Sequence, residues 1–147
     1  MTTSTQTNID ALNTVLGQTF RLYVQTHGYR WNVEGPNFRL LHSLFEAQYQ
    51  NLWAALDDIA ERIRIQGAYA PGTVVDLMKL APAEAAPTHS AEAMITTLIA
   101  EHDTIAGTLR DAIKAAGVAG DEVSVGLLTD RLEWHEKELW MMKASTR

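Results

Sequence analysis

The chain has 147 residues, 46% of them hydrophobic and 20% charged, which suits one domain with a buried core. It contains no cysteine, and this excludes disulfide bonds, cysteine-ligated zinc, iron–sulfur clusters and thiol catalysis. The formal net charge is −6 and only four residues are lysine, so we expect DNA binding to be weak or absent, because DNA phosphates are bound mainly by Lys and Arg.

No segment has the composition of a membrane helix or a secretory signal. Stretches without a charged residue run to only about a dozen residues, whereas a membrane helix needs roughly 20. Residues 1–20 contain no Lys or Arg, and a secretory signal normally begins with basic residues. We therefore expect a cytoplasmic protein with no membrane partner.

Apolar residues at steps of three and four predict helices along almost the whole chain. The predicted helices, in chain order, cover about 8–34, 37–66, 73–80, 90–116 and 121–143. A polar stretch over 1–7 is expected to be a flexible tail, followed by a single domain over 8–147. Side chains of the N-cap type stand before four of the helices, namely Asn37, Thr73, Ser90 and Asp121.

The lengths and order of these helices predict an all-α fold. Two long helices are followed by a long connection that carries a short helix of its own, and two more long helices follow. A long connection between the second and third long helices is typical of the ferritin-like four-helix bundle rather than of a simple up-and-down bundle.

The second helix carries the side chains that best suit a metal ion. At about 100° per residue, His42, Glu46, Asp57 and Glu61 fall within an arc of roughly 100°. His42 and Asp57 are nevertheless about 22 Å apart along the axis, so one helix cannot bring them to one ion. Two antiparallel copies related by a two-fold axis near Asn51 would do so, with nitrogen and oxygen ligands that suit iron, manganese or zinc.

The spacing also has simpler interpretations. Acidic pairs four residues apart are common on solvated helix faces, and a lone histidine is more often hydrogen-bonded than a metal ligand. No Glu is followed by His three residues later, so a di-iron site inside one bundle is not expected.

A longer motif resembles a known family. Residues 26–38 read Thr-His-Gly-Tyr-Arg-Trp-Asn-Val-Glu-Gly-Pro-Asn-Phe, Leu41-His42 follows, and residues 57–63 read Asp-Asp-Ile-Ala-Glu-Arg-Ile. These segments are similar to the Dps family of mini-ferritins, the DNA-binding proteins of starved bacterial cells. The resemblance extends over about 8–143 and includes His135-Glu136-Lys137 of the last helix.

The resemblance implies a hollow dodecamer built from two-fold dimers. It implies that the protein oxidises Fe(II), preferably with hydrogen peroxide, and stores the ferric iron, which protects the cell and its DNA from oxidative stress. Association with the nucleoid is implied by the resemblance only. Carried over to this chain, the iron ligands are His42 and Glu46 of one subunit with Asp57 and Glu61 of its partner.

The chain departs from the family at Arg30, where a second ligand histidine is usual. Arginine stays protonated and has no lone pair to offer, so it cannot replace that ligand. His27, one turn earlier, is a partial substitute, and Arg30 pairing with Asp57 or Glu61 in the cation's place is a second alternative. An exposed charge at the helix end is a third. The alternative function is therefore a structural or DNA-associated cage with an impaired oxidation site.

We expect the remaining candidate residues to act mainly in packing and at interfaces. Trp31 lies beside the site, where packing is favoured over radical quenching, and Tyr49 and Trp53 are predicted to anchor the two-fold interface. His102 and His135 are expected to be packing or surface residues. Acidic residues at or near the start of the last helix are candidates for lining an ion pore, as in the family, namely Asp121, Glu122 and Asp130.

Overall fold

The structure is a computed structural model that describes residues 2–146. Within residues 2–146 there are five helices, in the order α1 (Thr3–Asn32), α2 (Phe38–Ile65), α3 (Val74–Lys79), α4 (Ala91–Val118) and α5 (Glu122–Ser145). The prediction of an all-α, ferritin-like four-helix bundle with a short extra helix in the long connection is confirmed. Among the helices of residues 2–146, none combines the length and the hydropathy of a membrane-spanning segment.

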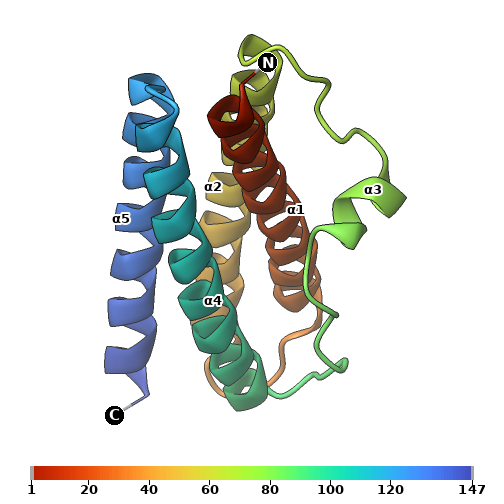
Figure 1. Cartoon of the computed structure of the whole chain (residues 1–147). Coiled ribbons are helices and arrows are strands. Elements are labelled where there is room, and N and C mark those ends of the chain that lie inside the picture. The colour runs from red at the N-terminus through yellow and green to blue at the C-terminus, as the bar shows by residue number, and fades with distance from the viewer. Residues whose placement is uncertain (1, 147) are drawn as a thin grey trace.

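The four long helices form two hairpins that pack against each other (Figure 1). Helices α1 and α2 lie side by side, as do α4 and α5, and α1 also packs against α4. The short helix α3 lies outside the bundle, against α1. One side of α2 is therefore left at the surface, and this side carries the candidate site.

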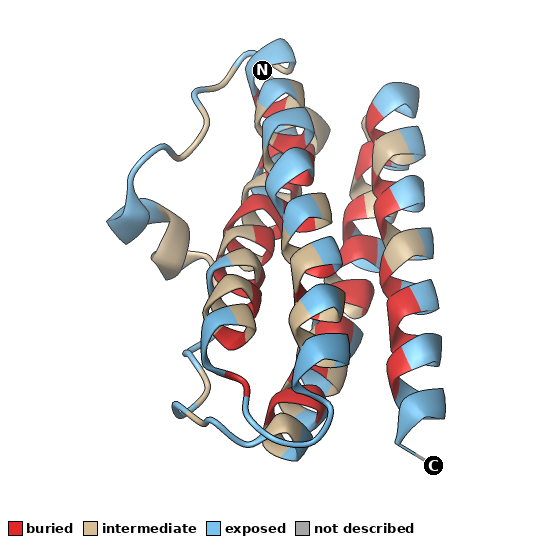
Figure 2. Cartoon of the chain, turned by 180° about the vertical axis from the view of Figure 1, so that it is seen from behind, coloured by how far each residue is buried: buried red, intermediate tan, exposed pale blue. Residues whose placement is uncertain are grey.

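Buried residues line the inward faces of the long helices (Figure 2). They form two apolar clusters. The first cluster includes Leu12, Ile59, Ile105 and Leu128, and the second includes Leu22, Phe45, Leu98 and Met142. Where one cluster gives way to the other, α1, α4 and α5 bury polar side chains, namely Arg21, His102, Arg131 and His135.

The two buried histidines form a pair between α4 and α5. Their Nδ1 atoms are 3.0 Å apart, so one ring donates a hydrogen bond and the other accepts it. Burial lowers the pKa of His102 to about 3, with a further contribution from the positive charge of Arg131. Burial also lowers the pKa of His135 well below its ordinary value. Both rings are therefore neutral packing residues, which was one of the two alternatives predicted.

The first helix begins earlier than predicted. The Thr2 hydroxyl accepts a hydrogen bond from the backbone N–H of Thr5 at 3.1 Å, which caps a helix that starts at Thr3. Residues 3–7 are helical, so the predicted flexible tail over 1–7 is wrong from Thr3 onward, and Met1 lies outside the described residues. All other helix ends lie within two residues of the predicted positions.

Candidate metal site

His42 lies in the first half of α2, opposite the C-terminal end of α1. Its Nδ1 is 2.8 Å from the backbone carbonyl oxygen of Arg30, one of the last carbonyls of α1, which have no partner within the helix. A carbonyl can only accept, so Nδ1 carries the proton and Nε2 keeps a free lone pair. Histidines that bind metals are commonly oriented by such a hydrogen bond from the other ring nitrogen.

Glu46 lies one turn beyond His42 and forms an ion pair with Arg30. The Arg30 Nη2 is 3.6 Å from the Glu46 Oε1, which is an ion pair but too long for a hydrogen bond. The Arg30 side chain is 23% exposed, so it is not the freely exposed helix-end charge that was one alternative. Within one chain its carboxylate partner is Glu46, because the end of α1 lies beside the first half of α2 rather than the second.

Asp57 and Glu61 lie on the second half of α2 and are exposed. Within residues 2–146 neither carboxylate takes part in an ion pair, so both are available to a ligand or a second chain. No three His, Asp or Glu side chains of the described residues lie close enough to hold a metal ion. The structure therefore does not bring the four predicted ligands together in one chain.

An aromatic stripe lies between the two halves of the α2 face. It consists of Tyr23, His27 and Trp31 on α1 with Tyr49 and Trp53 on α2. The His27 ring stacks on Tyr49 with centroids 3.8 Å apart, and its Nδ1 is 3.0 Å from the Tyr23 hydroxyl oxygen. These contacts engage His27 within the stripe, and no contact links it to His42 or Glu46.

Both tryptophans of the aromatic stripe face solvent. Trp31 is 64% exposed and Trp53 is 60% exposed, so the packing role predicted for Trp31 is not fulfilled inside this chain. Exposed aromatic side chains in a contiguous group indicate an interaction surface rather than ordinary solvated helix. The sequence indicated Trp53 and Tyr49 as interface anchors, but it did not show that Tyr23 and His27 belong to the same surface.

The three candidate pore residues have different environments. Asp121 is buried, caps α5 through the backbone N–H of Ser124, and accepts hydrogen bonds from Asn8 at 3.0 Å and from Arg62 at 2.5 Å. Burial raises the pKa of Asp121, but these hydrogen bonds and the Arg62 charge outweigh it and lower the pKa overall. Asp121 therefore joins α1, α2 and α5.

The other two candidate pore residues are free of such contacts. Glu122 and Asp130 are exposed on α5. They are the members of the predicted pore set that remain open to an ion.

Comparison with known proteins identifies relatives of the whole chain. The ferritin-like domain family matches residues 9–147. A DNA protection during starvation protein of Brevibacillus brevis is 33% identical over 124 residues, which are 84% of this chain and 83% of that protein. An uncharacterised low-temperature-induced protein of Nostoc is 35% identical and matches 92% of this chain and 78% of its own length.

Solved structures show the same fold. A Dps protein of Bacillus brevis superposes with a TM-score of 0.96 at 30% identity, over 100% of this chain and 99% of that one. A Dps protein of Vibrio cholerae, described as a member of a broad superfamily of ferritin-like diiron-carboxylate proteins, gives a TM-score of 0.94 at 30% identity, over 99% of this chain and 92% of that one.

Proposed function

The chain belongs to the Dps family of ferritin-like proteins, and from that premise we propose that it binds Fe(II) and oxidises it, preferably with hydrogen peroxide. The ferric product is stored inside a hollow dodecamer in the cytoplasm. Removing both iron and peroxide protects the cell and its DNA from oxidative stress. Iron is the substrate in this function.

The orientation of His42 is the observation that carries the proposal. Its Nδ1 is engaged by a backbone carbonyl, so Nε2 is offered to a cation beside the Glu46 carboxylate. Asp57 and Glu61 of a second copy complete a ligand set of one imidazole and three carboxylates. Such mixed nitrogen and oxygen ligands suit iron, manganese and zinc.

The geometry of α2 supports a two-fold pairing of chains. If two copies of α2 run antiparallel and cross near Asn51, His42 and Glu46 of each copy lie opposite Asp57 and Glu61 of the other. The same pairing covers the exposed tryptophans of the aromatic stripe. One interface then explains both the divided ligand set and the exposed rings.

Stopped-flow oxidation of Fe(II) by peroxide tests the site. Asp57→Ala/Glu61→Ala is expected to oxidise iron much more slowly than wild type, because two of the four ligands are lost. Asp103→Ala/Asp111→Ala removes the same charge from the exposed face of α4 and is expected to keep the wild-type rate. If the Asp57/Glu61 variant is as fast as wild type, iron does not react at this site.

A second candidate function is favoured by the Arg30–Glu46 ion pair. The guanidinium lies near the position that a cation would need, so the protein would be a structural or DNA-associated cage with an impaired oxidation site. The assembled wild-type protein distinguishes the two functions. Peroxide consumption by Fe(II) that is faster with the assembly than without protein supports oxidation, whereas an intact assembly that leaves the protein-free rate unchanged supports the cage.

A further inference from the structure

Arg30 contacts both ligands that this chain supplies to the candidate site. Its backbone carbonyl accepts the hydrogen bond from His42 Nδ1 at 2.8 Å. Its guanidinium lies 3.6 Å from the carboxylate of Glu46. A fixed positive charge is thus located next to the carboxylate, on the same residue whose carbonyl orients the imidazole.

The guanidinium is held by charge rather than by a network of hydrogen bonds. Its side chain is 23% exposed, and its Nε is buried without a hydrogen-bond partner among residues 2–146. The distance to Glu46 is beyond hydrogen-bonding range. The Arg30 guanidinium therefore contributes mainly a positive charge to the site, as a bound cation would.

Formal charges decide how many metal ions the site accommodates. The proposed carboxylates of Glu46, Asp57 and Glu61 carry −3 together, and Arg30 reduces this to −2. One divalent ion brings the site to neutrality. A second divalent ion would leave an excess of two positive charges in a partly buried interface, where like charges repel strongly.

We propose that Arg30 takes the place of a second cation, so that each candidate site binds a single divalent metal ion. The inference rests on the proposed function, because Asp57 and Glu61 come from a second copy. It assigns Arg30 as a positioning residue that orients His42 through its main chain and limits metal occupancy through its side chain.

Zinc is a suitable probe, because it binds the same ligands and undergoes no oxidation. The assembled protein is dialysed against Zn²⁺, the bound metal is counted, and zinc is located in crystals by anomalous scattering. Wild type is expected to show one zinc at each candidate site, which makes two at each two-fold interface, and His42→Ala is expected to lose them. Arg30→His, which removes a charge and adds a ligand, is expected to show two at each candidate site.

Two variants that replace an arginine with neutral glutamine separate the effect of the Arg30 charge on the bound ion from the effect of the net charge of the protein. Arg30→Gln is expected to bind the first zinc roughly tenfold more tightly, because a repulsive charge near the ion is gone. Arg39→Gln removes an exposed arginine of α2 that forms no ion pair among the described residues, and it is expected to change the affinity much less.

The outcomes distinguish this inference from the proposed function. Two zinc ions at each wild-type site, or one in Arg30→His, would overturn the role of Arg30 while leaving the site in place. Equal affinities of Arg30→Gln and Arg39→Gln would overturn it as well. If no zinc binds at the candidate site, or if His42→Ala does not change the amount of zinc bound there, the proposed site itself would be overturned.

Discussion

Position 30 brings a permanent positive charge to the ligands of the candidate site. Arg30→His is expected to raise the rate of Fe(II) oxidation by peroxide roughly tenfold or more, because it removes a repulsive charge and adds an imidazole. Stopped-flow absorbance of the ferric product measures the rate, with Lys114→His, at an exposed position of α4, as the control for an imidazole added elsewhere. A fast wild type that Arg30→His does not improve would mean that Arg30 points away from the reacting iron.

The buried pair of His102 and His135 makes stability depend on pH. Both rings have a lowered pKa in the folded chain, so the unfolded chain binds protons first as the pH falls. The contribution of His102 to stability is therefore complete above about pH 6.5 and is lost progressively toward pH 3, at roughly 1.4 kcal/mol per pH unit. His135 acts in the same direction. Glu101 and Glu138, whose pKa is raised chiefly by burial, act in the opposite direction.

Urea unfolding at several pH values and one protein concentration tests this dependence. The variant His102→Leu/His135→Leu is expected to lose less stability than wild type between pH 7 and pH 5, because neither ring can titrate. His89→Leu, at an exposed position in the connection before α4, is expected to keep the wild-type dependence. Parallel curves for the double variant and wild type would show that other groups control acid stability.

Residue spacing was sufficient to find the candidate ligands but not their partners. His42 and Glu46 could be placed on one helix face because the α-helical repeat is regular. The ion pair of Arg30 with Glu46 depends on the turn between α1 and α2, which sets how far the end of one helix overlaps the start of the next. No periodicity in the sequence carries that information, and the same is true of the His102–His135 contact between α4 and α5.

At the scale of the helices, side-chain caps explain which boundaries were predictable. Thr73, Ser90 and Asp121 each accept a hydrogen bond from a backbone N–H at the start of a helix, as their residue types indicate. Asn37 makes no such bond, although α2 does begin directly after it. Thr2 caps α1 in a segment without apolar periodicity, and that is why the pattern placed the start of α1 too late.

The close packing of α3 on α1 depends on one glycine. A Cβ at Gly17 would lie 2.6 Å from Leu80 Cβ and 2.7 Å from the Leu77 carbonyl oxygen, so α3 would have to move. Gly17→Ala is expected to destabilise the protein by about 1–3 kcal/mol, offset in part by the roughly 1 kcal/mol by which alanine favours a helix. Gly107→Ala in α4, where nothing lies within 4 Å, is expected to be neutral or stabilising.

Urea unfolding compares the two alanine variants, and amide hydrogen exchange reports on α3. Faster exchange in α3 is expected for Gly17→Ala and not for Gly107→Ala. Equal stability of the two variants with unchanged exchange in α3 would show that the short helix adjusts without cost.

For the whole molecule, the aromatic stripe is the surface whose burial we expect to hold two chains together. Trp53→Glu is expected to weaken the dimer, because it replaces an exposed ring at the proposed two-fold axis with a charge. Light scattering measures the mass, and Thr104→Glu adds the same charge to the exposed face of α4 as a control. A wild-type mass near the 16.3 kDa of one chain would contradict assembly altogether.

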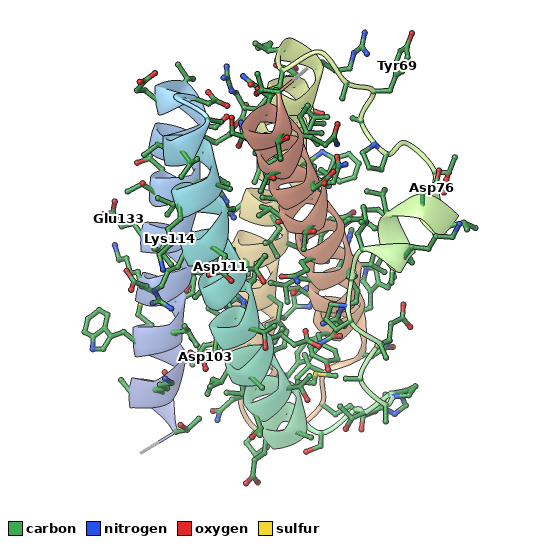
Figure 3. All side chains as sticks on the ribbon, viewed as in Figure 1. Tyr69, Asp76, Asp103, Asp111, Lys114 and Glu133 are labelled. Carbon is green, nitrogen blue, oxygen red and sulfur yellow. The ribbon has the colours of Figure 1, made fainter. Side chains whose placement is uncertain are left out.

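Charge predicts weak or absent DNA binding by the assembled protein. Each copy contributes a net charge of −6, and residues 1–20 offer no basic side chain. Figure 3 shows Lys114 among Asp103, Asp111 and Glu133 on α4 and α5, so this part of the surface is mixed rather than basic. No shift of plasmid DNA is expected in a gel at about 150 mM salt without divalent cations. A clear shift under those conditions would contradict the prediction.

The distance along α2 between its two pairs of candidate ligands makes metal affinity depend on protein concentration. If two chains share the candidate site as proposed, metal capture and chain association are thermodynamically linked, and each strengthens the other by the same factor. Dilution that separates chains would release metal, and metal would hold together chains that otherwise dissociate. The metal affinity of this protein is then a property of its concentration as well as of its ligands.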